Sequence, residues 1–258
     1  MVDKSPERRN QLDDKGGRHD NRKLIVVKSY YSYRMTNNLP SSNQRTREHG
    51  YEAAYRLACE QLAKIDNIER QCHKSDAQYI DSQRAIIIGY LNQSYLITLP
   101  DVEVSLVDRE EKVPIRDKIL ILHYFNMAKG TPLTNKIITY KELPEGANYF
   151  PTFYKRAIKP LATYFGNEPH RLPDMARILG GHEADYGDAA VTINAFSRVP
   201  ITLVLWKGDE EFAPEGNIMF DSTISDYLPA EDIIVLCQTI VWKLVKGLKA
   251  GGDNPGRN

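Results

Sequence analysis

The sequence predicts an α+β protein with a single main domain, in which antiparallel sheets pack against several helices. Two groups of short segments rich in β-branched residues lie in different parts of the chain, with turn residues between neighbouring segments. The helical patterns occur in separate stretches. They do not alternate with the strands, as they would in a doubly wound nucleotide-binding fold. A length of 258 residues is enough for one large domain or two small ones.

Composition excludes several classes of protein. Apolar residues make up 41% of the chain and charged residues 26%, which is typical of a globular protein. The formal net charge is zero, so the whole chain offers no electrostatic basis for binding nucleic acid. No apolar run approaches the roughly 18 residues of a membrane span, and the N-terminus lacks the pattern of a signal peptide. Cys59, Cys72 and Cys237 are an odd number without CxxC spacing, which argues against a disulfide framework and against a self-contained zinc or iron–sulfur site. We expect a soluble protein of a reducing cytoplasm, with no membrane partner.

The chain divides by composition into a tail, a domain and a second tail. Residues 1–50 hold 11 Lys and Arg against 6 Asp and Glu, whereas the rest of the chain is mildly acidic. Residues 1–48 contain too little apolar surface to offset the entropy of ordering, so we predict a disordered basic tail there. Residues 49–248 form the predicted domain. Residues 249–258 are rich in Gly and Asn and are predicted to be a disordered C-terminal tail.

The first half of the domain combines helices with an antiparallel meander. Apolar residues at three- and four-residue spacing predict a helix over 51–70. Strands are expected at 84–90, 94–99 and 102–107, separated by Asn92-Gln93 and Pro100-Asp101. Pro114 suits the first position of a second helix, which runs to a C-terminal cap at Gly130 and is apolar around most of its circumference. That helix should therefore lie in the core.

The second half continues with a strand, broken helices, a second antiparallel set and a last helix. The strand is expected at 136–140. Prolines interrupt helical segments at 150–165 and 171–179. Further strands are expected at 189–196, 200–206 and 217–220. The last helix covers 231–248, and Glu231 and Asp232 lie in its first turn, where negative charge suits the helix dipole.

The densest acidic cluster is formed by Asp209, Glu210 and Glu211, between two predicted strands. Oxygen ligands of this kind suit Mg²⁺ or Ca²⁺, and a carboxylate can also act as a general acid or base. The alternative is an acidic but merely solvated hairpin connection, since Gly208-Asp209 is a good turn pair.

Gly180, Gly181, His182 and Asp188 surround a short polar loop. Paired glycines permit positive φ and close approach to the backbone, as anion-binding loops require. The chain has neither GxGxxG nor GxxxxGK[ST], so the nucleotide motifs are absent. The alternative is a helix C-cap followed by a turn. His182, beside the glycines, is a candidate metal ligand or acid–base group.

Two further candidates lie on predicted helices. His123 shares a helix face with Ile119 and Met127 and should point inward, either as a hydrogen-bonded core residue or as a cofactor ligand or proton carrier. Arg156 follows an aromatic patch at 149–154, and two interpretations follow: it holds an anionic or planar ligand, or it lies along an amphipathic face. Asp221 is expected to cap the turn that follows it.

A family resemblance rests on many ordered blocks of sequence. They are Leu120–Phe125, Gly130–Thr134, Lys141–Pro144, Phe153–Arg156 with Pro160–Ala162, Leu179–Gly181, Gly187–Asp188, Val199–Pro200, Leu205–Phe212, Phe220–Ser222 and Tyr227–Asp232. Over residues 51–248 the chain resembles the uncharacterised family known as domain of unknown function 3786 (DUF3786).

The resemblance implies members mainly from anaerobic bacteria and archaea, some fused to a cysteine-rich iron–sulfur module of the kind seen in corrinoid proteins. This chain lacks such a cysteine set. Three hypotheses follow. The first is a module that binds an anionic or tetrapyrrole-like (corrinoid) cofactor through His123, Arg156 and the 180–188 loop, with an iron–sulfur or corrinoid protein as partner. The second is a divalent-metal enzyme using Asp188 with residues 209–211. The third is a structural or assembly partner protein.

Overall fold

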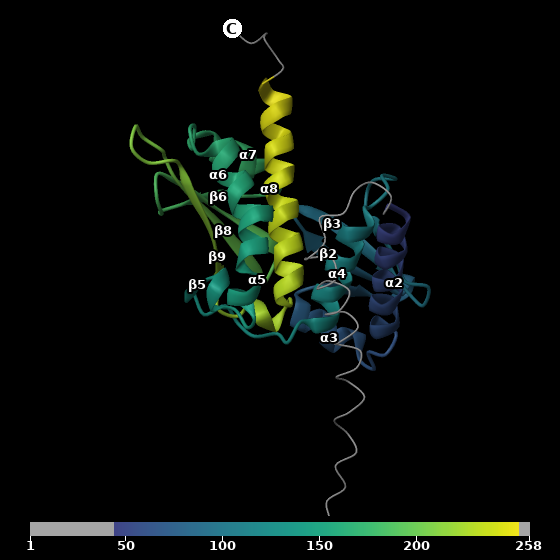
Figure 1. The fold of residues 1–258 in the computed structure, drawn as a ribbon. Coiled ribbons are helices and arrows are strands. Elements are labelled where there is room, and N and C mark those ends of the chain that lie inside the picture. The colour runs from purple at the N-terminus through teal and green to yellow at the C-terminus, as the bar shows by residue number, and fades with distance from the viewer. Residues whose placement is uncertain (1–43, 253–258) are drawn as a thin grey trace, which may run out of the picture. The chain divides into compact units, whose positions relative to one another are not determined.

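The computed structural model describes the backbone of residues 44–252 and the side chains of residues 49–250. The tail predicted for residues 1–48 therefore lies mostly outside the described residues, as do residues 253–258. The second of two compact units of the chain, Thr46–Asn258, contains the fold described below. It is an α+β domain with two antiparallel sheets, which confirms the predicted class (Figure 1).

The predicted meander forms a four-stranded sheet with the order β1-β2-β3-β4. Its strands are β1 (Gln78–Ile80), β2 (Ala85–Tyr90), β3 (Gln93–Thr98) and β4 (Glu103–Leu106). Leu91 and Asn92 both have positive φ, as a two-residue hairpin between β2 and β3 requires. Strand β1 was not predicted, since three residues are too few to show an alternating pattern.

The helix predicted over 51–70 is wrong as a single element. The chain instead forms α2 (Gln44–Leu62) and α3 (Ile68–Ser75). Asn67 accepts a hydrogen bond from the backbone N–H of Arg70, which is the local reason why a new helix begins there. Helix α2 also begins inside the predicted tail, so that residues 44–48 are helical.

Two helices lie at the centre of the domain, α4 (Ile115–Met127) and α8 (Ala230–Gly252), whose residues 230–237 are buried. Every residue of α4 from Ile119 to Phe125 is buried, as its apolar circumference predicts. Pro114 precedes α4 as its N-cap rather than its first residue, and the helix ends at Met127, three residues before the predicted cap. Helix α8 continues through residues 249–252, which the sequence placed in a disordered tail.

The second sheet has five strands in the order β5-β9-β8-β7-β6. They are β5 (Ile137–Thr139), β6 (His182–Ala184), β7 (Ala189–Phe196), β8 (Val199–Trp206) and β9 (Glu215–Asp221). Strand β6 lies where only a polar loop was expected. The N–H of Leu91 donates to the carbonyl of Ala195 at 3.0 Å, which joins the two sheets at the end of β2 and the bend of β7.

The helices between the two groups of strands cover only one face of the five-stranded sheet. They are α5 (Gly146–Phe153), a π-helical segment (Tyr154–Ile158), α6 (Lys159–Phe165) and α7 (Arg171–Ala176). Helices α6 and α7 pack against strands β9 and β7 and also against α8. Figure 1 shows these helices between the sheet and α8, and residues 44–252 place no helix over the opposite side of the sheet.

Candidate functional site

His123 on α4 points inward, as predicted, and is 6% exposed. Its Nδ1 lies 2.6 Å from Oδ2 of Asp232, which is fully buried in the first turn of α8. Burial lowers the pKa of His123, but the charge of Asp232 and the hydrogen bond to it raise that pKa by more, so the net shift is upward. The other carboxylate oxygen of Asp232, Oδ1, is buried without a hydrogen-bond partner. The pair connects two core helices and favours a charged imidazole.

Arg156 lies in the π-helical segment that follows α5, and its side chain donates through Nε and Nη2 to Oε1 of Gln238 on α8. The neighbouring Tyr140 is buried, and its hydroxyl donates to the carbonyl of Ala230 at 3.0 Å. Burial raises the pKa of Tyr140 strongly, the charge of Glu231 raises it further, and Arg156 acts in the opposite direction. Arg156 therefore contributes to a polar cluster against the first half of α8.

The glycine pair ends a short 3₁₀ helix (Arg177–Leu179). Gly180 has φ +71° at the C-cap, which matches the capping alternative. Gly181 packs so closely that an added Cβ would lie 2.7 Å from the Cβ of Ala176. His182 is exposed on strand β6 and pairs with Thr192 of β7. The paired glycines thus serve a close packing contact beside the start of an edge strand.

Asp188 and the acidic cluster lie at one end of the five-stranded sheet. Oδ2 of Asp188 accepts a hydrogen bond from the N–H of Lys207 at 2.7 Å. Oδ1 of Asp209 accepts from the N–H groups of Glu211 and Phe212, at 2.8 and 2.7 Å, and these bonds lower the pKa of Asp209. These interactions hold the connection between β8 and β9 in a fixed turn.

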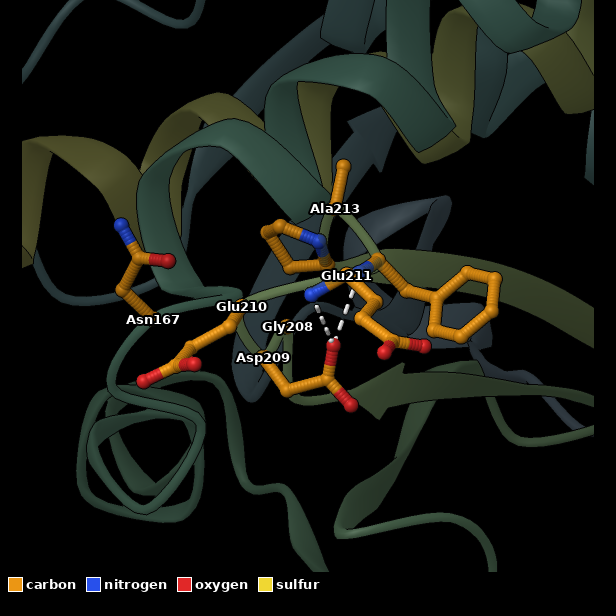
Figure 2. Close-up of a pocket in the computed structure, with 8 residues that line it drawn as sticks. Asn167, Gly208, Asp209, Glu210, Glu211 and Ala213 are labelled. Atoms are coloured by element: carbon orange, nitrogen blue, oxygen red, sulfur yellow. Dashed lines mark hydrogen bonds between the residues drawn. The ribbon is translucent and has the colours of Figure 1, made fainter.

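A shallow depression of about 420 Å³ lies on this connection and is lined by Asn167 and residues 208–214. In Figure 2 the side chain of Glu210 points away from that of Glu211, and the dashed lines from Asp209 end on backbone N–H groups. Within the described residues, no group of three or more His, Cys, Asp or Glu is arranged to hold a metal ion. His123, Arg156 and Gly180 do not line this depression.

The predicted site residues therefore fall into separate places. His123 and Arg156 contact α8 through Asp232 and Gln238. The loop that begins at Gly180 and the acidic cluster belong to the strands of the second sheet instead. The structure brings Asp188 close to the β8–β9 connection and leaves the two helix-borne residues apart from it.

Asp221, which was expected to cap a turn, does so and also forms hydrogen bonds to a loop that is distant in the sequence. Its carboxylate accepts hydrogen bonds from the N–H and hydroxyl groups of both Thr134 and Thr223 and from the N–H of Asn135. Burial raises the pKa of Asp221, but these bonds lower it by more, so the net shift is downward. The hydrogen bonds of Asp221 thus join the Gly130–Thr134 and Phe220–Ser222 blocks of the sequence.

The face of the five-stranded sheet over which the described residues place no helix, here called the uncovered face, is the feature that sequence reasoning missed. Its central residues Val204, Ala190 and Thr202 are nevertheless buried. Cross-strand partners share a face of a sheet, so the register identifies its outward residues. One row crosses all five strands and a second crosses four. The rows are His182–Thr192–Thr202–Met219–Thr139 and Ala184–Ala190–Val204–Asn217. None of these nine residues is Asp, Glu, Lys or Arg, although 26% of the chain is charged.

Exposed aromatic side chains stand at the end of this face. Trp206, the last residue of β8, is 42% exposed and pairs with Glu215. Tyr186, in the turn between β6 and β7, is 46% exposed, and Phe212, in the β8–β9 connection, is 69% exposed. The Asp188–Lys207 hydrogen bond described above connects the first turn to the residue after Trp206. The aromatic rings are thus carried on linked turns.

A signal for this face was present in the sequence. The segment of β8 is apolar at nearly every position, which predicts a strand buried on both sides. Only the tertiary arrangement reveals that helices cover one side alone.

The described part of the chain has no helix with the length and apolar character needed to span a bilayer. No curated protein and no solved structure matches the chain. A family model matches residues 67–243, which is more than half of the sequence and includes most elements of the domain. The chain therefore belongs to the family described as Domain of unknown function (DUF3786).

Proposed function

We propose that this domain is a protein-binding module that docks a partner protein on the uncovered face of its five-stranded sheet. This is the assembly-partner hypothesis of the three that the sequence left open. The observation that carries it is the charge-free pair of residue rows across the uncovered face, described above.

The composition of the face supports docking over simple solvation. An antiparallel sheet that faces water usually alternates apolar residues inward with polar and charged residues outward. Here the positions on this side of the sheet include the half-buried Met219 and the buried Val204 and Ala190, and the hydroxyl groups of Thr192 and Thr202 bond each other at 2.8 Å. Protein interfaces are depleted of charge at their centre and enriched in aromatic residues and Met. The face has this composition, with Trp206 at its end.

The small-molecule and metal hypotheses receive less support. His123 already uses Nδ1 to bond Asp232, and Arg156 already donates to Gln238. A corrinoid or tetrapyrrole ligand stays a prediction, as does a cation at Asp209, whose Oδ1 receives two backbone N–H groups.

A photo-crosslinking experiment tests the docking surface. A benzophenone amino acid replaces Trp206 in the full chain, expressed in its native host, and Val107 is replaced in the same way as a control. Val107 is 39% exposed and follows β4 of the other sheet. We expect a discrete adduct from position 206 and none from position 107.

A charge placed in the face provides the decisive comparison. Met219→Lys puts a cation of similar length among the outward residues, whereas Met127→Lys makes the same change at the end of α4, also partly exposed. The adduct from position 206 should disappear with Met219→Lys and persist with Met127→Lys, while both variants keep the melting temperature of the parent. An adduct that survives Met219→Lys, or that forms equally at position 107, would refute the proposed docking surface.

A further inference from the structure

We infer that the second half of α8 binds the surface of an anionic phospholipid bilayer, with lysines on the headgroups and aromatic rings beside them. We call this region the α8 surface and define it by Tyr164, Ile178, Trp242, Lys243, Lys246 and Lys249. It is separate from the uncovered face, because α6 and α7 lie between α8 and the five-stranded sheet (Figure 1). The inference therefore goes beyond the proposed docking function and does not depend on it.

Two exposed aromatic rings form one side of the α8 surface. Trp242 belongs to α8 and Tyr164 to α6, and both side chains are exposed. Their ring centroids are 5.8 Å apart, with the edge of one ring toward the other. Nζ of Lys249 lies 5.0 Å from the centroid of the Tyr164 ring. These contacts join α6 and α8 into one surface, on which a cation and two rings already lie together.

An exposed aliphatic side chain forms the opposite side. Ile178, in the 3₁₀ helix that follows α7, is 64% exposed. Its Cδ1 would lie 3.5 Å from a Cβ added at Gly247, so Ile178 packs against α8. Each residue of an α-helix turns by about 100°, so Lys246 and Lys243 follow Trp242 by about 40° and 100° around the axis, and Gly247 by about 140°. Both lysines therefore lie between the aromatic rings and Ile178.

The charge of the α8 surface is positive, although the whole chain is neutral. From residue 233 to residue 252, α8 contains three Lys and no Asp or Glu, and all three Lys are exposed. The acidic residues of α7 and of the loop before it already pair with arginines. Asp174 lies 3.7 Å from Arg177, and Glu168 lies 3.2 Å from Arg171. The lysines of α8 therefore keep an excess of positive charge on this side of the domain.

One of these lysines also has an inward role. Burial raises the pKa of Asp117 on α4, and the charge of Lys243 acts in the opposite direction. Lys243 thus partly compensates a buried carboxylate. Within residues 49–250, neither Lys246 nor Lys249 forms a salt bridge. These two lysines are therefore the ones open to an external anion.

This combination of side chains favours a bilayer over other anionic partners. Basic clusters are attracted to anionic lipids, and Trp and Tyr rings lie at the level of the headgroups. An aliphatic side chain such as Ile178 gains from the acyl boundary but offers no face on which a nucleic-acid base can stack. Protein interfaces are enriched in Arg and depleted of Lys, whereas the free cations here are all Lys.

The position of the helix also suits a flat partner. Figure 1 shows the last turns of α8 projecting beyond α6 and α7, which leaves them open to an extended surface. Contact of this kind reaches only the headgroup region and needs no spanning helix, although composition alone suggested no membrane partner.

Vesicle binding followed by tryptophan fluorescence tests the inference. The chain has two tryptophans, so Trp206→Phe leaves Trp242 as the only reporter. The probes are vesicles of phosphatidylcholine alone and vesicles of phosphatidylcholine and phosphatidylglycerol in equal parts. With the mixed vesicles we expect a blue shift of the emission and co-sedimentation of the full chain, and with the neutral vesicles neither. High salt should release the protein, because it screens the attraction.

A pair of double variants isolates the role of the lysines. Lys246→Gln/Lys249→Gln should weaken binding to the mixed vesicles by about thirtyfold, since each lysine near an anionic membrane contributes about fivefold. Lys136→Gln/Lys141→Gln removes two exposed lysines that flank β5 and should leave binding unchanged. Both double variants should keep the melting temperature of the parent.

The outcomes separate this inference from the docking function. Equal weakening by the two double variants, or Trp242 emission that does not move with mixed vesicles, would overturn the inference. Binding of single-stranded oligothymidine in place of vesicles would overturn it in favour of a nucleic-acid partner. In the crosslinking experiment, the adduct from position 206 should persist with Lys246→Gln/Lys249→Gln. Its loss would assign α8 to the docking interface and refute a separate lipid surface.

Discussion

Nδ1 of His123 lies 2.6 Å from Oδ2 of Asp232, across a sequence separation of 109 residues. The contact joins the two central helices, α4 and α8, and both side chains are buried. A buried ion pair gains little over an apolar pair of the same shape, but removing one partner leaves a charge or a polar group without compensation. The pair is therefore a sensitive point for stability.

The stability contributed by this pair should depend on pH. The folded pKa of His123 lies above its ordinary value of 6.5. The contribution is therefore fully present below about pH 6.5 and is lost as pH rises through the raised folded pKa. Asp232→Asn removes the carboxylate charge and should lower the free energy of unfolding by about 3 kcal/mol at pH 5.5. Chemical denaturation of parent and variant from pH 5.5 to 9 measures the difference, which should shrink toward the alkaline end.

The control for this measurement is His182→Gln, which removes an exposed histidine on strand β6. It should leave the pH dependence of stability unaltered. A difference between parent and Asp232→Asn that stays constant from pH 5.5 to 9 would contradict the assigned role of the pair.

Asp221 should be the most costly carboxylate to remove among those at strand ends. Asp221→Ala leaves the backbone N–H groups of Thr134, Asn135 and Thr223 without their acceptor. We expect the free energy of unfolding at pH 7 to fall by about 3 kcal/mol, because hydrogen bonds to a charged group are individually strong. Since the folded pKa of Asp221 is lowered, its contribution in the parent is lost only as pH falls below the ordinary value of 3.8.

The matched control is Asp188→Ala, which removes an exposed carboxylate that accepts one backbone hydrogen bond. It should cost less than about 1 kcal/mol. Equal losses for the two variants would contradict the view that Asp221 fastens the Gly130–Thr134 loop.

The success of sequence reasoning followed the length of each pattern. The bounds of long periodic segments, such as α4 and α8, were predicted to within a few residues, as were those of longer strands such as β7. Their pattern of buried positions repeats many times along the chain. The three-residue strands β1 and β6 carry no repeat and were missed, whereas β5, of the same length, was predicted at 136–140. The break at residues 63–67 was missed because Ile65 continues the helical spacing, although the chain turns there before a new N-cap at Asn67.

The sequence did not predict which residues far apart along the chain contact each other. His123 was correctly predicted to point inward, but nothing in its neighbourhood identifies Asp232, which the sequence presented as a dipole-stabilising residue of a first turn. The uncovered sheet face was hidden for a similar reason. The apolar run of β8 predicts burial on both sides, and Ile201–Leu205 are indeed all buried, although α5–α7 lie on one side alone.

Gly181 should be required for packing rather than for binding an anion. Gly181→Ala places a Cβ 2.7 Å from the Cβ of Ala176 and 2.9 Å from its carbonyl oxygen. We expect a loss of about 1–3 kcal/mol in the free energy of unfolding. The control is Gly89→Ala in β2, where an added Cβ has no neighbour within 4 Å. If Gly181→Ala were neutral, or if inorganic phosphate stabilised the parent and not the variant, the packing role would be refuted.

Two of the three thiols should react only when the protein unfolds. Cys72 and Cys237 are buried, whereas Cys59 is partly exposed. Burial raises the pKa of Cys72 to about 11 and that of Cys237 well above its ordinary value, so both the access and the thiolate needed for reaction are lacking at pH 8. Titration with a chromogenic disulfide should therefore detect at most one thiol in the native protein and three in denaturant. With Cys59→Ser, the native signal should vanish and the denatured count should fall to two. Rapid reaction of a second native thiol would show that the core around α3 or α8 opens more readily than its packing implies.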